Sequence, residues 1–222
     1  MIAIIDYGVG NLFSLAHSLK AVGAEPVVTG EAEVIRRADH VILPGVGAFG
    51  DAADKLRDTG LDRVVKNVAA AGTPIMGICL GMQLLLDRSY EFGEHEGLGL
   101  IPGEVRPIAE VIPSGYKIPH IGWNALVLRR RARVTGPDGR EGAPAPHPIF
   151  KQVAQGDCVY FVHSYYGARC DDHVIATAEY GAMLTAAVAK DNVVGCQFHP
   201  EKSGRVGLEI LRQFCDWDGV SL

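Results

Sequence analysis

Cys79 lies between two glycines in the segment Gly77-Ile78-Cys79-Leu80-Gly81, directly after a short apolar run. The pattern G-x-C-x-G is typical of a nucleophile elbow, a sharp strand-to-helix turn that exposes a reactive side chain. Glycines are needed there because the backbone folds back closely on itself. The start of a helix behind the thiol favours its thiolate form, and its N–H groups can receive an oxyanion. We therefore predict that Cys79 is a nucleophile and not a buried structural cysteine.

A nucleophilic cysteine needs a base, and the base needs an orienting group. Of the eight histidines, His199 is the best placed, because it follows an apolar run and can project from the end of a strand. Glu201 comes two residues later, and Pro200 stiffens the link. The order of these residues predicts a Cys-His-Glu triad in which Glu201 orients the imidazole of His199.

A third glycine-containing segment, Leu43-Pro44-Gly45-Val46-Gly47, also follows an apolar run. Two glycines one residue apart allow backbone N–H groups to approach a ligand closely, as an oxyanion hole requires. Gly8-Val9-Gly10 is similar to the start of a dinucleotide-binding loop, but position 13 is Phe where a third glycine is needed. We therefore expect no NAD site and no other cofactor.

The segments that must position these residues alternate between short β-branched runs and stretches with helical spacing. Strands are expected at Ile2–Ile5, Pro26–Thr29, 41–43 and 74–78, and helices at 11–22 and 61–71. This alternation predicts an α/β fold with a mostly parallel central sheet and helices on both faces.

The second half of the chain has a different character. Strand-like runs at 104–108, 125–128, 159–163, 174–178, 186–189 and 194–198 are separated by few helices, and a helix is expected at 204–216. An additional antiparallel portion is therefore predicted here. Residues 129–148 are rich in Arg, Gly, Pro and Ala and lack apolar periodicity, which predicts a flexible, exposed insertion loop in a single domain of residues 1–222.

Composition narrows the function classes. A net charge of -5 argues against a nucleic-acid-binding protein. No apolar run approaches the ~18 residues that a membrane-spanning helix needs. Five cysteines without C-x-x-C spacing indicate neither a disulfide framework nor a metal site. The N-terminus lacks the pattern of a signal peptide, so a reducing, cytoplasmic location is expected.

Together, Gly77-Ile78-Cys79-Leu80-Gly81-Met82-Gln83, Pro44-Gly45-Val46-Gly47 and Phe198-His199-Pro200-Glu201 resemble the class I (triad) glutamine amidotransferases, which have a flavodoxin-like architecture. The chain is most similar to the glutaminase subunits of imidazole glycerol phosphate synthase. That narrower resemblance rests on 6–11, on 44–50, on His120-Ile121-Gly122-Trp123-Asn124 and on Tyr160-Phe161-Val162-His163-Ser164-Tyr165.

The resemblance implies roles for individual residues. Cys79 would attack the side-chain amide of glutamine, with His199 as base and Glu201 as orienting group. Backbone N–H groups of Leu80 and of the Val46 region would hold the oxyanion. The substrate's amino-acid end would be bound by Gly47, Gln83, Glu91, Ser164 and Tyr165.

The same resemblance implies a partner. In this family the ammonia passes to a (β/α)8-barrel cyclase subunit of imidazole glycerol phosphate synthase, in histidine biosynthesis. Asn11, Trp123 and Tyr160 resemble residues at that interface, although without the resemblance the two aromatic residues are interpreted as packing residues, Tyr160 especially so within its strand.

Two alternatives remain open from the sequence. Another triad amidotransferase, serving anthranilate or pyridoxal phosphate synthesis, would share the chemistry and differ in the acceptor of ammonia. An unrelated cysteine hydrolase on a similar fold would use Cys79 and a histidine without Gln83 or the Ser164-Tyr165 segment.

Overall fold

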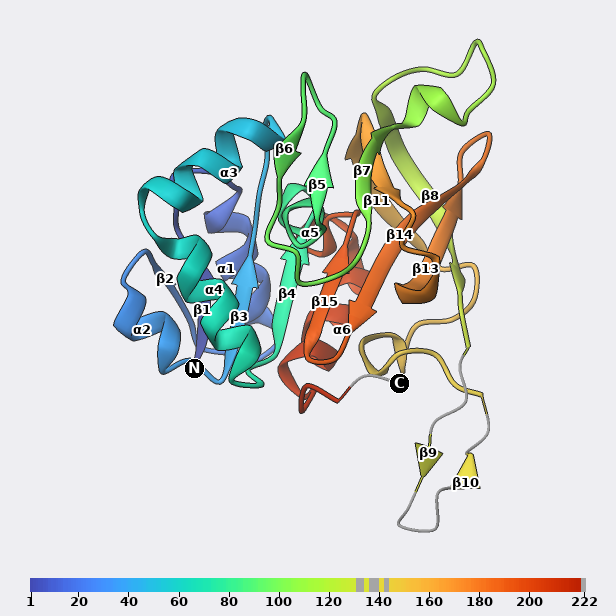
Figure 1. The fold of residues 1–222 in the computed structure, drawn as a ribbon. Coiled ribbons are helices and arrows are strands. Elements are labelled where there is room, and N and C mark those ends of the chain that lie inside the picture. The colour runs from blue at the N-terminus through green and yellow to red at the C-terminus, as the bar shows by residue number, and fades with distance from the viewer. Residues whose placement is uncertain (131–133, 136–139, 142–143, 221–222) are drawn as a thin grey trace.

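The computed structural model describes residues 1–130, 134–135, 140–141 and 144–220. Its central sheet begins with parallel strands: β1 (Ile2–Ile5), β2 (Pro26–Thr29), β3 (His40–Leu43), β4 (Ile75–Ile78) and β15 (Val193–Cys196). Antiparallel strands continue the sheet: β14 (Met183–Lys190), β13 (Val174–Glu179), β8 (His120–Leu128) and β11 (Cys158–His163). The nine strands follow the order β11-β8-β13-β14-β15-β4-β3-β1-β2 (Figure 1). The predicted α/β class and antiparallel second half are confirmed.

A smaller sheet lies beside the large one. It contains β12 (Tyr165–Ala168), β7 (Glu104–Pro107), β5 (Arg88–Ser89) and β6 (His95–Glu96), in that order. Its strand β12 follows β11 after one residue, so the chain passes directly from the edge of the large sheet into the small one.

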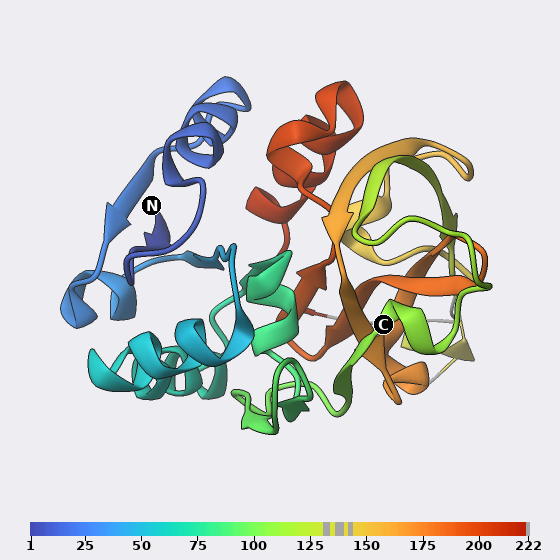
Figure 2. The same ribbon diagram turned by 90° about the horizontal axis from the view of Figure 1, so that it is seen from above.

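Helices cover both faces of the parallel strands (Figures 1 and 2). One face carries α1 (Leu12–Ala21) and α6 (Gly204–Cys215), and the other carries α2 (Ala32–Arg36), α3 (Phe49–Asp58) and α4 (Leu61–Ala70). The short helix α5 (Leu80–Leu84) follows β4. Single 3₁₀ turns are formed by Ile108–Glu110, Pro148–Phe150, Asp171–His173 and Pro200–Lys202. No helix in the described part of the chain is long and apolar enough to cross a membrane.

Alternation along the strands divides the core into two layers. In β1, Ile2 and Ile4 belong to the layer beneath α1 and α6, whereas Ala3 and Ile5 belong to the layer beneath α2, α3 and α4. Successive strand residues point to opposite faces, so a strand buried on both sides must be apolar throughout. This explains why the first strand was recognisable as a continuous apolar run.

Several elements differ from the sequence-based expectation. Helices α2 and α3 were not predicted, because they are short or rich in alanine and charge and show no long apolar stripe. Strand β8 begins at His120, five residues before the expected start, and β15 ends at Cys196, before the expected end at 198. The two strand differences concern only the ends of elements, whose positions apolar patterns define least well.

Within the expected loop 129–148, the short strands β9 (Val134–Thr135) and β10 (Arg140–Glu141) form an antiparallel pair. Much of that segment (131–133, 136–139 and 142–143) lies outside the described residues, so its predicted flexibility stays a prediction. The predicted exposure does not extend to the end of the segment, because the side chain of His147 is buried against Trp217 at a ring distance of 5.1 Å.

Phe214 of α6 belongs to the core layer beneath α1 and α6, and replacing it tests the packing of that layer. Its side chain is fully buried, so Phe214→Ala should lower the free energy of unfolding by about 3–5 kcal/mol. Phe13 of α1 lies on the same side of the sheet but is 84% exposed, so Phe13→Ala should change stability by less than about 0.5 kcal/mol. Urea titrations of both variants measure the difference, and equal losses would contradict the assigned core.

Candidate active site

Cys79 occupies a strained turn between β4 and α5. Its backbone has φ 55° and ψ -110°, a positive-φ conformation that residues other than glycine rarely adopt. The Cys79 N–H donates to the carbonyl of Cys196 at 2.7 Å, which ties the turn to the end of β15. The turn is therefore held by the neighbouring strand, and the sequence expectation of an elbow matches the observed geometry.

The glycines around Cys79 are required by close backbone contacts. A Cβ on Gly81 would lie 1.8 Å from the carbonyl oxygen of Leu43, and a Cβ on Gly77 would lie 2.7 Å from backbone atoms of Gly81. A Cβ on Gly45 would lie 2.9 Å from the Cβ of Leu80 and from the Gly81 nitrogen. No larger residue fits at these positions without moving the backbone.

His199 and Glu201 form a desolvated pair beside the elbow. Nδ1 of His199 lies 2.8 Å from Oε1 of Glu201, and each side chain is only 3% exposed. Burial disfavours the charged imidazole, but the nearby sulfur of Cys79, the hydrogen bond to Glu201 and the negative charge of both groups outweigh it and raise the pKa of His199 to about 9. The arrangement stabilises an imidazolium next to the sulfur.

One nitrogen of this histidine remains available for chemistry. Nε2 of His199 is buried, and no described residue forms a hydrogen bond with it. The same holds for Oε2 of Glu201. A buried polar atom without a partner is unfavourable and occurs most often at functional sites. Because Nδ1 is engaged by Glu201, Nε2 is the atom that can take up and release a proton.

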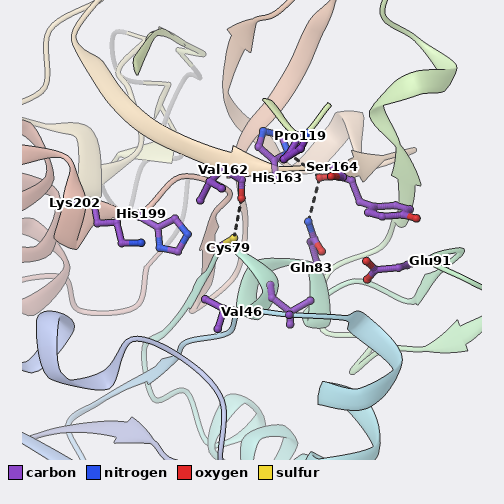
Figure 3. A pocket seen from close by; sticks show the side chains of 13 residues that line it. Val46, Cys79, Gln83, Glu91, Pro119, Val162, His163, Ser164, His199 and Lys202 are labelled. Carbon is purple, nitrogen blue, oxygen red and sulfur yellow. Dashed lines mark hydrogen bonds between the residues drawn. The ribbon is translucent and has the colours of Figure 1, made fainter. Parts of the chain in front are cut away.

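These groups border a pocket of about 360 Å³. Its lining residues are Val46, Gly47, Cys79, Leu80, Gln83, Glu91, Pro119, Val162, His163, Ser164, Tyr165, His199 and Lys202. In Figure 3, Cys79 lies between His199 on one side and Gln83 and Glu91 on the other. The residues expected to bind substrate from the sequence therefore lie in one cavity with the thiol. Glu201 lies behind His199, in a small cleft that Asn11 also lines.

Gln83 and Glu91 have contacts that restrict their roles. Nε2 of Gln83 donates to the Tyr165 carbonyl at 3.1 Å and to Oε1 of Gln197 at 3.0 Å, so both amide hydrogens are engaged. Oε2 of Glu91 accepts from the Phe49 N–H at the start of α3, at 2.6 Å. Burial raises the pKa of Glu91, although the Phe49 N–H opposes this. Only the carbonyl oxygen of Gln83 and the second carboxylate oxygen of Glu91 are left for a ligand.

The residues expected at a partner surface lie on two paired strands and one helix start. Trp123 is 55% exposed and contacts Tyr160 edge to face at 6.0 Å, and the two are register partners in β8 and β11. Asn11 caps α1, accepting from the Ser14 N–H at 3.4 Å. Trp123 is therefore not a core residue, and the packing interpretation does not account for it.

Sequence reasoning gave no role to several residues at the site. Gln197 is fully buried, and its Nε2 lies 3.8 Å from the sulfur of Cys79. His163 and Lys202 line the pocket. Gln197 precedes His199 by two residues, and residues two apart share a face of an extended segment, a signal that could have identified it. In the described ranges, no group of three metal-binding side chains is placed to hold an ion.

The glycine contacts give a direct test. Gly81→Ala should abolish folding or lower the free energy of unfolding by about 3 kcal/mol or more, because Leu43 O belongs to a buried strand and cannot move aside. Gly60→Ala provides the control: its φ is 72° but the space is open, so a loss of about 1 kcal/mol is expected. Chemical denaturation measures both, and a tolerated Gly81→Ala would show that the elbow can relax.

Comparison with known proteins agrees with this geometry. The family model for glutamine amidotransferase class-I matches residues 3–217. Imidazole glycerol phosphate synthase subunit HisH of Bacillus cereus is 47% identical over 214 residues, which is 96% of this chain and 93% of that protein. The subunit of the same name from Wolinella succinogenes is 41% identical, covering 97% and 99%.

Solved structures show the same fold at lower identity. A crystal structure of a glutamine amidotransferase aligns over 99% of this chain and 100% of its own, with a TM-score of 0.72 and 18% identity. The structure of PurLQS from Thermotoga maritima aligns over 97% of both chains, with a TM-score of 0.67 and 21% identity. Because the family model covers almost the whole chain and the relatives are similar over nearly their full length, the chain belongs to the class I glutamine amidotransferase family.

Proposed function

We propose that the chain is the glutaminase subunit of an imidazole glycerol phosphate synthase, with Cys79, His199 and Glu201 as its catalytic residues. The observation that carries the proposal is the strained Cys79 turn beside a buried His199–Glu201 pair with an unpartnered Nε2. The family model, whose description names glutamine, covers almost the whole chain and supports glutamine as the substrate.

The geometry supports a two-step hydrolysis. His199 Nε2 takes the thiol proton before the attack, so that the imidazolium stands beside the sulfur, and Cys79 Sγ then forms a carbon–sulfur bond with the amide carbon of glutamine while the carbonyl oxygen takes up the negative charge. The protonated His199 then gives its proton to the amide nitrogen, the carbon–nitrogen bond breaks, and ammonia leaves a thioester. Water, deprotonated by His199, attacks the thioester, and glutamate and the free thiol are released.

Two backbone segments are suited to the oxyanion. The N–H of Leu80 belongs to the first turn of α5, where N–H groups have no partner within the helix. The loop containing Val46 and Gly47 borders the same pocket. We propose that the Leu80 and Val46 N–H groups hold the negative oxygen of the tetrahedral intermediate.

The opposite end of the pocket suits the amino-acid end of glutamine. A substrate with its amide at Cys79 must extend away from His199, toward Glu91, Gly47 and the Ser164–Tyr165 backbone. We propose that the free oxygen of Glu91 and the carbonyl oxygen of Gln83 accept from the α-ammonium group. Gln83 also holds the Tyr165 carbonyl, so it shapes this end of the site as well.

The subunit name of the relatives implies a partner cyclase subunit. We further propose that this partner is a (β/α)8 barrel and that it contacts Trp123, Tyr160 and Asn11. Ile121, on the same side of β8 as Trp123, is 58% exposed, which gives this strand an apolar outer face. Exposed aromatic and aliphatic side chains beside a pocket are typical of an interaction surface.

The two other functions considered for this chain are less well supported. An unrelated cysteine hydrolase does not account for the relatives or for the Gln83–Tyr165 contact at the pocket. Amidotransferases that serve other acceptors share the triad, but the relatives with 41–47% identity carry the name of the imidazole glycerol phosphate synthase subunit.

Cys79→Ala tests the nucleophile and the partner together. The variant should form the complex with the cyclase and lose glutamine-dependent synthesis, because no thioester can form. It should keep synthesis from added ammonium salt, because the second reaction takes place on the partner. Product formation with each nitrogen source measures both. Retention of glutamine-dependent turnover would exclude Cys79 as the nucleophile. Loss of synthesis from ammonium as well would contradict the proposal that the second reaction takes place on the partner.

Glu201→Gln tests the orienting group. His199→Ala should lower kcat/KM by about 10³-fold and Glu201→Gln by less, because the base itself remains. The variant also loses the carboxylate that raises the pKa of His199, so the imidazolium is lost at a lower pH. The alkaline limb of the pH–rate profile, expected near pH 9, should therefore move to lower pH. An unshifted limb, or a larger loss at Glu201, would contradict the assignment.

A further inference from the structure

Behind the pocket, two buried histidines form a chain of hydrogen bonds that the triad does not use. Nδ1 of His163 lies 2.8 Å from the Tyr165 carbonyl oxygen, and its Nε2 lies 3.0 Å from Nδ1 of His120. Nε2 of His120 lies 2.7 Å from Oδ1 of Asn124. His163 is 6% exposed and His120 1% exposed, so water does not replace these bonds.

Both ends of this chain are acceptors. The Tyr165 carbonyl can only accept. The orientation of the Asn124 amide is fixed, because its Nδ2 donates to the Glu179 carbonyl at 2.8 Å and so leaves Oδ1 facing His120. The outer nitrogens of both imidazoles must therefore be N–H groups. The central bond needs one further N–H, which makes three protons on two rings and one positive charge.

The position of His163 connects this chain to the substrate site. Its Nδ1–H and the Nε2 of Gln83 both donate to the same carbonyl, that of Tyr165. Ser164 and Tyr165 line the end of the pocket proposed for the amino-acid end of glutamine. Removing the His163 donor would leave the carbonyl held from one side only.

We propose that His163 is a positioning residue for glutamine binding: it fixes the Ser164–Tyr165 backbone, and it shares three protons with His120 when all three hydrogen bonds are made. The part that concerns glutamine rests on the proposed function. His163 touches no reacting atom in this scheme and acts through the Tyr165 carbonyl.

Burial opposes a positive charge on the His120–His163 pair, whereas the neighbouring aromatic rings favour it. Burial lowers the pKa of His120, and burial together with the charge of His120 and His199 lowers that of His163 to about 4, although the bond to Tyr165 opposes this. His120 stacks on Tyr180 at 4.0 Å and on Phe161 at 5.0 Å, and the face of an aromatic ring attracts positive charge.

His163 shares the lining of the pocket with other titratable groups, namely Cys79, His199, Lys202, Glu91 and Tyr165. Without the third proton, one of the three contacts must place a lone pair against a lone pair, and that bond is lost. The geometry, with all three distances short, points to the protonated pair.

A spectroscopic measurement tests the proton count without any assay of activity. In ¹⁵N-histidine-labelled protein in complex with the cyclase at neutral pH, the ring nitrogens of His120 and His163 should show three protonated atoms in all. His120→Phe and His163→Phe assign the signals. Two protonated atoms would overturn the shared charge.

Kinetics test the positioning role in the same complex, with L-glutamine as substrate and ammonia release as readout. His163→Phe removes the donor and should raise KM about tenfold or more while kcat changes less than about threefold. His163→Asn keeps an N–H where Nδ1 lies, so KM should stay within about threefold of the wild type. His40→Phe is the matched control, because His40 also bonds a backbone carbonyl, that of Trp217, away from the pocket.

The outcomes separate the two proposals. An inactive wild-type complex would count against the proposed function itself. An active wild type with an unchanged KM in His163→Phe would overturn the positioning role alone. Should His163→Phe fail to fold, His163→Asn still decides. An unchanged KM in His163→Asn supports the positioning role, and a raised KM contradicts it.

Discussion

The active site depends on one close contact, that of the backbone at Gly81 with the carbonyl of Leu43. This contact places the first turn of α5 against the end of β3. It thereby brings the Pro44–Gly47 loop next to Leu80, where Gly45 again leaves no room for a side chain. Two loops far apart in sequence can then offer backbone N–H groups to one point. The glycines were visible in the sequence because this geometry admits no alternative residue.

The second constraint is the removal of water from His199 and Glu201. A buried carboxylate that retains one unpartnered oxygen is stable only beside a positive charge, and the imidazolium supplies it. The opposing effects of burial and hydrogen bonding on the His199 pKa therefore end in favour of the charged form.

The parts of the fold and site that could be predicted from the sequence are those fixed by local rules. The parallel strands were recognisable as continuous apolar runs, and Cys79, His199 and Glu201 by residue type next to strand ends. Helix α3 was missed because its buried face consists largely of small residues such as Ala52 and Ala53.

Contacts between distant segments could not be predicted. Nothing local to Gln197 or His163 indicates that their side chains meet Gln83 and His120, because those contacts exist only once the sheet has formed. The role of Glu91 likewise depends on its reaching the Phe49 N–H across the fold. In each case the residues come together only in the folded structure, and the composition and periodicity of the sequence carry no information about such contacts.

The topology explains how a strand at the edge of the sheet becomes a wall of the pocket. Strand β11 is four places from β15 in the sheet order, yet the Tyr160 carbonyl accepts from the His199 N–H at 3.0 Å, and the Val162 carbonyl lies 4.0 Å from the Cys79 sulfur. The antiparallel half must therefore curl back over the ends of β4 and β15, as its curvature in Figure 2 shows. Parallel strands thus carry Cys79 and His199 at their ends, and the curled edge forms the opposite wall of the pocket. Because the exposed Trp123 is the register partner of Tyr160, whose carbonyl binds the His199 N–H, a protein bound at Trp123 would be one strand away from His199 and could alter the pocket without a long path of coupling.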